Sequence, residues 1–164
     1  MRFSKKVAFA IVVIAAAAFA TAAAADRHGG RSHQHGKLLR ANLVGSILSD
    51  PLIHGRNRGG LPWEGNGTAS LDRKGRFEFR IRNLVIEGTG SARPVTTIKV
   101  SLFCAPDSNL IPAFTTDSAP LSEDGDARIR EHVTVPARCL APVLLVHPNG
   151  NLNAYIAASG FTSG

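Results

Sequence analysis

Apolar and polar residues alternate along much of the chain after residue 36. In the clearest segment, Arg76–Arg82, aromatic or aliphatic residues occupy every second position and charged residues occupy the positions between them. Strict alternation is typical of a strand that lies half-buried in an antiparallel sheet. The turn-forming segment Asp72–Gly75 precedes it, and the residues before this turn alternate too, so we predict a β-hairpin over 67–83.

The rest of the domain follows the same pattern. No segment after the first 25 residues combines a helical period with capping residues, whereas nine prolines and sixteen glycines separate short apolar runs. This favours an all-β fold, which we expect to be a single antiparallel β-sandwich, with a small β-barrel as the alternative. In the predicted strand 127–135, Glu131 falls on the side that should face the core, which indicates a bulge or an edge position. The further predicted strands cover 37–48, 96–104, 110–116, 127–135, 142–147 and 153–161.

The chain begins with a short basic segment, an uncharged apolar run and an alanine tract. Ala23 and Ala25 are small residues at the two positions that signal peptidases read, so we predict a signal helix over 1–25 that is cleaved off. An uncleaved membrane anchor is the alternative, but the second half of the segment consists mainly of alanine, which is only weakly hydrophobic for a membrane-spanning helix. Residues 26–36 predict a disordered His/Gly/Arg leader, which leaves 37–164 as one domain.

Basic residues exceed acidic ones in the exported part. Three of the 19 Lys and Arg lie in the predicted signal peptide, so 16 remain against 12 Asp and Glu, a net charge of +4. Such an excess attracts anions, but the few aromatic residues do not alternate with basic ones as a base-stacking surface requires. The sequence does not identify the partner: an anionic envelope polymer and another surface protein are the candidates, and we expect no nucleic acid and no membrane association after signal cleavage.

The chain contains two cysteines, Cys104 and Cys139. In an exported protein an even number indicates disulfide bonding, and two cysteines allow one intramolecular pair. A metal pair or a redox pair is the alternative, but both normally need the close C-x-x-C spacing that is absent here. We therefore predict a disulfide in a secreted, periplasmic or cell-surface protein.

The segment 49–66 is long, rich in glycine and proline, and contains the single tryptophan of the chain. Loops of this length in a compact domain are often functional. We interpret it as a candidate ligand loop, in which Trp63 offers a flat apolar surface and Arg56 or Arg58 pairs with an anion, with His54 beside them. The alternative, which we favour because a lone large aromatic side chain usually belongs to the core, is that Trp63 packs there and the arginines are solvated.

Candidate chemistry elsewhere is sparse. His54, His132 and His147 could converge with Asp50 or Glu131 in a small metal-dependent or hydrolytic site, although separate hydrogen-bonded histidines are the simpler interpretation. The histidines of the leader offer at most a weak metal site, and no nucleophile motif is present. We therefore predict no catalytic residues, no metal and no cofactor.

A basic stripe runs along the predicted hairpin. Alternation directs Arg76, Arg80 and Arg82 to one exposed face, where they could contact a polyanionic envelope polymer. The alternative is a solvated face whose charges pair with Asp72 and Glu78.

Several short runs resemble a known family. Gly67–Leu71, followed by a glycine turn and Phe77–Ile81, is similar to the opening hairpin of CHRD-type secreted β-sandwich domains, and Asn153–Ile156 is similar to their late strand. The resemblance implies a secreted β-sandwich over Gly67 to Phe161. Thr96–Val100 stands where those domains carry paired histidines, and the two cysteines are not part of their pattern.

Residues 50–55 and 145–150 resemble a group of small exported proteins without an assigned activity. The sequence therefore favours an exported, non-enzymatic module that binds a partner or has a structural role at the cell surface or outside the cell. The alternative is a small extracytoplasmic enzyme that uses the three histidines named above.

Overall fold

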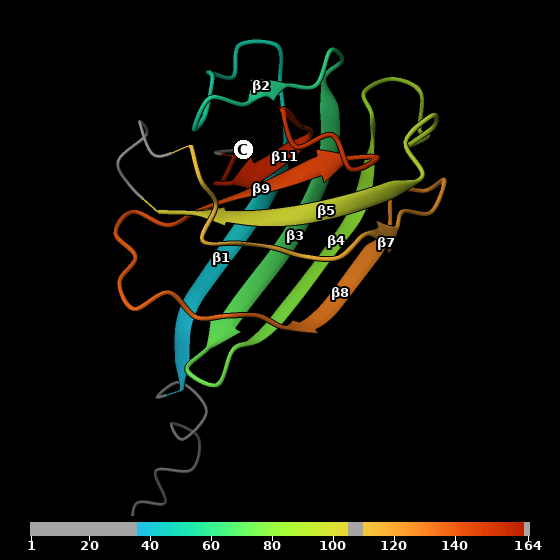
Figure 1. The fold of residues 1–164 in the computed structure, drawn as a ribbon. Helices are drawn as coiled ribbons and strands as arrows, with labels where there is room; N and C mark the ends of the chain where they lie inside the picture. Colours follow the sequence, from blue (N-terminus) through green and yellow to red (C-terminus); the bar gives the residue numbers. More distant parts are fainter. Residues whose placement is uncertain (1–35, 105–109, 163–164) are drawn as a thin grey trace, which may run out of the picture. The chain divides into compact units, whose positions relative to one another are not determined.

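The computed structural model describes residues 36–104 and 110–162, and every regular element in these ranges is a β-strand (Figure 1). The all-β prediction is therefore confirmed for the described part of the chain. No helix there is long and apolar enough to cross a membrane. The predicted signal peptide at 1–25 and the predicted leader up to residue 35 lie outside the described residues.

Most predicted strands are present, with shifted ends. Segment 153–161 forms two short strands instead of one, and the candidate ligand loop ends earlier than expected because Trp63 already begins a long strand. The strands are β1 (Lys37–Gly45), β2 (Asn57–Arg58), β3 (Trp63–Asp72), β4 (Arg76–Ile86), β5 (Thr97–Phe103), β6 (Phe114–Thr115), β7 (Ala119–Pro120), β8 (Ala127–His132), β9 (Val143–Pro148), β10 (Ala154–Tyr155) and β11 (Ala157–Ser159).

The strands form one curled antiparallel sheet, not the two separate sheets of the expected sandwich. Its hydrogen-bonded order is β6-β5-β9-β11-β1-β3-β4-β8, with β7 also paired to β5, and β2 and β10 form a small parallel pair (Figure 1). The physical reason lies in β1, which pairs with β3 along its length and with β11 at its end. Because one strand carries ladders on both edges, the two halves remain one sheet, curled into a half-barrel.

Two glycines allow the sheet to bend where β1 meets β3. The register of β3 and β4 shifts between Glu64 and Asn66, at Gly65, whose φ of 145° favours glycine. Such a bulge bends a strand and increases its twist. On the neighbouring strand, a Cβ atom at Gly45 would overlap the carbonyl oxygen of Trp63. A side chain at either position would hold the backbones apart, so both glycines favour the curl.

The curl encloses the main hydrophobic core. Phe77 of β4 meets Phe114 of β6 edge to face, with ring centroids 5.1 Å apart, although these strands belong to opposite ends of the sheet. Near the same place, Glu131 of β8 accepts a hydrogen bond from the backbone N–H of Asp117 at 2.9 Å. β8 is the last strand in the order of the sheet, so Glu131 lies on an edge strand. An edge position was one of the two explanations that the sequence offered for this residue.

A long loop covers the outer face of β5 and β9. We call residues 46–62 the loop cap. Beneath it lies a smaller apolar cluster of Phe103, Leu145 and Tyr155 that is separate from the main core. The hydroxyl of Tyr155 donates a hydrogen bond to the carbonyl oxygen of Pro51 at 2.6 Å and thereby fastens the cap to this cluster.

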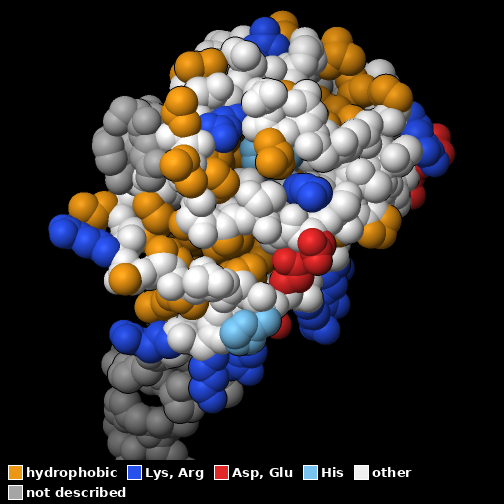
Figure 2. All heavy atoms as spheres, viewed as in Figure 1, with side chains coloured by type: hydrophobic (Ala, Val, Ile, Leu, Met, Phe, Trp, Pro, Cys, Tyr) orange, Lys and Arg blue, Asp and Glu red, His pale blue; other side chains and the backbone are white. Residues whose placement is uncertain are grey.

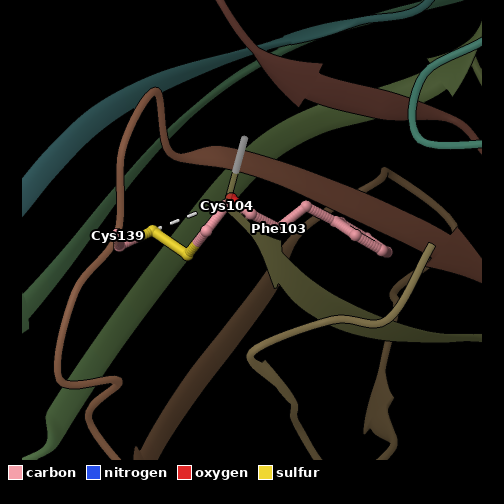
Figure 3. Close-up of a disulfide and its surroundings, with 3 residues drawn as sticks. All are labelled: Phe103, Cys104 and Cys139. Carbon is pink, nitrogen blue, oxygen red and sulfur yellow. Dashed lines mark hydrogen bonds between the residues drawn. A yellow bond between two sulfur atoms is a disulfide. The ribbon is translucent and has the colours of Figure 1, made fainter. Parts of the chain in front are cut away.

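The predicted disulfide between Cys104 and Cys139 is confirmed (Figure 3). Cys104 follows β5, whereas Cys139 lies in the connection 133–142 that leads from β8 to β9. Their Cα atoms are 5.0 Å apart, and the sulfur of Cys139 lies 4.0 Å from the carbonyl oxygen of Phe103. The bond therefore holds the connection 133–142 to the end of β5.

Candidate functional site

The outward face of β1, β3, β4 and β8 is polar and basic. Antiparallel registry aligns its side chains in rows across the four strands, because residues of equal parity share a face. One row contains Arg40, Ser70, Glu78 and Arg130, and the next contains Asn42, Thr68, Arg80 and Arg128.

These rows form a groove of about 670 Å³. The short polar side chains of Thr68 and Ser70 on β3 lie between β1, which carries Arg40 and Asn42, and β4, which carries Arg80. Strands in a sheet are about 4.8 Å apart, so the change from long to short side chains by itself creates a depression. We call this depression the basic groove; it is lined by Lys37, Arg40, Ala41, Asn42, Thr68, Ala69, Ser70, Glu78, Phe79, Arg80 and Arg128.

The charges of the basic groove are poorly balanced. Arg80 lies directly opposite Arg128 on the neighbouring strand, a like-charge pair that destabilises a sheet. The carboxylate of Glu78 lies 4.0 Å from Arg130, at the limit of an ion pair. Among the described residues, no carboxylate forms an ion pair with Arg40, Arg80 or Arg128. The groove therefore carries positive charge that the described part of the domain does not neutralise.

The basic stripe predicted on the hairpin divides into two parts. Arg80 lines the groove, and Arg82 is exposed on the same face in the next row. Arg76 instead serves the turn between β3 and β4, because its Nε donates a hydrogen bond to the buried carboxylate of Asp72 at 2.6 Å. The two arginines from other strands, Arg40 and Arg128, complete the groove and were absent from the predicted stripe.

The Asp72 carboxylate is a structural acceptor. Burial by itself would raise the pKa of this carboxyl, but the Arg76 side chain and the backbone N–H groups of Arg76 and Lys74 all donate hydrogen bonds to it. Hydrogen bonds to the ionised form outweigh burial here and hold the pKa of Asp72 below its ordinary value.

The candidate residues of the ligand loop are buried or hydrogen-bonded to nearby backbone carbonyls and do not form an open binding surface. Trp63 is only 5 % exposed and belongs to the main core, so its ring offers no open apolar platform. Arg56 donates hydrogen bonds to the carbonyl oxygens of His54 and Leu152, and Arg58 donates to that of Gly59 at 3.0 Å. Both arginines therefore hold the loop cap together, and a ligand-binding role of this loop remains a prediction.

Two of the three candidate histidines belong to the cap region, His54 in the loop cap itself and His147 on the strand beneath it. His54 is buried and its ring stacks on Phe103 at 4.8 Å, while the guanidinium of Arg56 lies 4.7 Å from the centroid of the same ring. His147 is buried on the same outer face of β9. His54 and Arg56 of the loop cap thus pack against Phe103, and His147 is buried farther along the same face of the sheet.

The third histidine lies elsewhere. His132 pairs with Arg76 at the beginning of β4, whereas the loop cap joins β3 at Trp63, which pairs with Ile86 at the other end of β4. Ten residues of strand separate these ends, roughly 30 Å at the usual rise. His132 and Glu131 on β8 are therefore not brought together with His54 and His147.

His147 is held as a neutral imidazole. Its Nδ1–H donates a hydrogen bond to the carbonyl oxygen of Ala154 at 2.7 Å, and its Nε2 atom is buried without a hydrogen-bond partner among the described residues. Burial lowers the pKa of His147, and the positive charge of Arg56 lowers it further, against the effect of the bond to Ala154. A buried imidazole with a lowered pKa contributes to packing and is poorly suited to accept a proton near neutral pH.

The Tyr155 hydroxyl is another titratable group of the cap region. Burial raises the pKa of Tyr155, and the nearby carboxylate of Asp50 raises it further, while Arg58 acts in the opposite direction. Within the described ranges, no group of three or more His, Cys, Asp or Glu side chains has the geometry of a metal site. The structure thus brings His54, His147 and Asp50 into the cap region without forming a recognisable catalytic arrangement there.

No protein-family model, curated protein or solved structure matches the chain. The resemblance to CHRD-type domains therefore stays a prediction, and the functional argument depends on the geometry of this domain alone. On that basis the basic groove is the strongest candidate site. Its signal was present in the sequence as alternation in 37–43 and 127–131, but strand pairing was needed to join those segments to Arg80.

Proposed function

We propose that this protein is an exported, non-enzymatic binding module that holds an anionic polymer of the cell envelope in its basic groove. The observation that carries the proposal is a set of three arginines, Arg40, Arg80 and Arg128, that no carboxylate of the described residues pairs with, around a floor of short polar side chains. Guanidinium groups bind carboxylates and phosphates with paired hydrogen bonds, and hydroxyl and amide groups bind sugar hydroxyls.

The shape of the groove favours a chain over a small anion. Its lining comes from β1, β3, β4 and β8, so an extended ligand can contact cations on both flanks at once. The Phe79 ring that borders the groove is buried in the core, so the site lacks the exposed aromatic side chains on which nucleic-acid bases stack. A polysaccharide or polyol-phosphate polymer is therefore the partner class that fits best.

Export supports the same proposal. The predicted signal peptide would deliver the domain to the envelope, and disulfides persist in oxidising compartments outside the cytoplasm. Electrostatic binding to a polyanion also agrees with the net positive charge that remains after cleavage.

The test is a binding titration of the exported protein against polygalacturonate and poly(glycerol phosphate), with neutral dextran as the reference polymer. The triple variant Arg40→Gln, Arg80→Gln, Arg128→Gln should bind the polyanions at least about tenfold more weakly, because each lost charge-assisted contact contributes about 1.5–3 kcal/mol when well formed. The salt dependence of binding should also become shallower.

A control variant separates the groove from general charge. Arg73→Gln, Arg93→Gln, Arg138→Gln removes the same number of positive charges from exposed positions outside the groove. It should bind within about twofold of wild type apart from long-range screening effects. Equal losses in both variants, or wild-type binding to dextran as strong as to the polyanions, would contradict the proposal.

A further inference from the structure

Exposed leucine and isoleucine side chains gather on and beside the loop cap. We call six of them the apolar rim: Ile47, Leu48, Leu52, Leu61, Leu110 and Leu152. Their exposed fractions lie between 39 % and 60 %, although each belongs to a residue type that is normally buried. Figure 2 shows hydrophobic side chains beside Lys and Arg side chains across the upper part of this view, over β2 and the loops near it.

Backbone contacts hold the members of the apolar rim close together. The bond from the Trp63 N–H to the Ser46 carbonyl, 2.7 Å long, brings the first and last residues of the loop cap side by side. Ile47 and Leu48 therefore lie near Leu61. These three form one group of the rim.

The second group surrounds Arg56. Its Nε donates to the carbonyl oxygen of Leu152 at 3.2 Å, and Leu110 lies against Gly55. Leu52 adjoins Pro51, whose carbonyl accepts the Tyr155 hydroxyl. Because these contacts already order the backbone, the rim side chains can be buried against a partner without the cost of folding a loop.

The charge of the loop cap is positive at this surface. Arg56 and Arg58 each keep N–H groups beyond those that bond to backbone carbonyls, since a guanidinium has five donors. Asp50, the carboxylate of the cap, accepts the N–H of Ile47 at 2.8 Å and so points back to the loop. Apolar side chains with guanidinium groups between them match the boundary between lipid tails and anionic headgroups.

We propose that the apolar rim docks the domain on the surface of an anionic lipid bilayer. The rim side chains line neither the basic groove nor the two smaller hollows, one beside Gly36 and Arg76 and one beside Cys139. They project from loops and turns outside the strands. Docking there would leave the basic groove free, because the groove lies on the other half of the curled sheet.

This inference differs from the sequence-based expectation of no membrane association after signal cleavage. The rim comes from three separate segments of the chain, each too short to produce an apolar run. Folding alone brings them to one surface, so a linear hydropathy pattern could not detect them.

The test is co-sedimentation of the exported protein, with its N-terminus determined by mass spectrometry, with phosphatidylcholine vesicles that contain one third phosphatidylglycerol. The variant Leu48→Ser, Leu52→Ser, Leu61→Ser should bind at least about tenfold more weakly, because three partly inserted side chains lose their apolar contact. The control Leu38→Ser, Leu140→Ser changes exposed leucines outside the rim and should bind as wild type does. Thermal melts of both variants should match that of wild type.

Two further measurements separate the alternatives. The groove variant Arg40→Gln, Arg80→Gln, Arg128→Gln should keep vesicle binding within about twofold, so the two proposals fail independently. Absence of vesicle binding by wild type, equal binding by the rim variant, or a dimer in light scattering that the rim variant abolishes would overturn the proposal. The last result would assign the rim to contact between two copies of the chain.

Discussion

Removal of the Cys104–Cys139 disulfide is a direct test of how the domain is held together. The bond closes a loop with a sequence separation of 35 residues. In the chain-entropy model, a loop of that size restricts the unfolded chain by about 13 cal/mol/K, or about 4 kcal/mol at 25 °C. The double variant Cys104→Ala, Cys139→Ala should therefore lose about 4 kcal/mol of unfolding free energy.

The position of the disulfide indicates which part of the domain would be destabilised most when it is removed. Connection 133–142 contains no strand, and together with β1, β3 and β5 it lines a hollow beside Leu39, Leu71 and Leu102. Without the disulfide this connection keeps its packing contacts and, at its first residue, the hydrogen bond from the Val133 N–H to the Gly75 carbonyl oxygen. Local opening should therefore begin there, and amide exchange in 133–142 should accelerate more than in β3 or β4.

Urea unfolding followed by tryptophan fluorescence measures the loss. With a urea m-value of about 2 kcal/mol/M, the midpoint of the double variant should fall by about 2 M. Reductant should lower the wild-type midpoint by a similar amount and leave that of the double variant unchanged. A loss below about 1 kcal/mol, or a reductant effect on the variant lacking both cysteines, would refute the loop-entropy reasoning.

Three more substitutions test the core, a turn and a buried histidine. Trp63→Ala should cost about 3–5 kcal/mol in urea unfolding followed by circular dichroism, since the variant has no tryptophan, because it empties a core position; a near-neutral result would show that the ring is not needed for packing. Asp72→Asn should destabilise the domain near neutral pH. Because the folded pKa of Asp72 is lowered, its stabilisation is present above about pH 4 and is lost in stronger acid, so melting curves of variant and wild type should converge there. The pKa of His147 is lowered in the folded protein, so below about pH 6.5 the unfolded chain binds more protons than the folded one. Wild-type stability should therefore decrease as the pH is lowered through that range. His147→Asn, which keeps a donor for Ala154, should flatten this dependence, and an unchanged slope would exclude His147 as its source.

Alternation along the chain predicted the parts of the fold that depend on local burial. The hairpin of β3 and β4 follows from it because each second residue from Phe77 onward enters the core, and a glycine turn joins the strands. The disulfide followed from cysteine number and the predicted export, not from any geometric signal. Neither prediction required knowledge of which strands pair.

Strand pairing was beyond the sequence, and with it the difference between a sandwich and one curled sheet. Alternation states which side of a strand is buried but not which neighbour it binds, so the double pairing of β1 could not be anticipated. For the same reason, the sequence could not show that Arg40 and Arg128 lie in the same groove as Arg80, because this depends on which strands pair and in which register. Trp63 was assigned to a loop because glycines on both sides obscured the beginning of β3.

A strand with hydrogen-bonded neighbours on both edges leaves the domain without a hinge. To separate the half that contains β5 and β9 from the half that contains β3 and β4, the β1–β11 ladder would have to break and the main core would have to be exposed. Clamp-like closure around a partner is therefore not available to this architecture. Recognition has to use preformed outer surfaces, and affinity should depend little on conformational change.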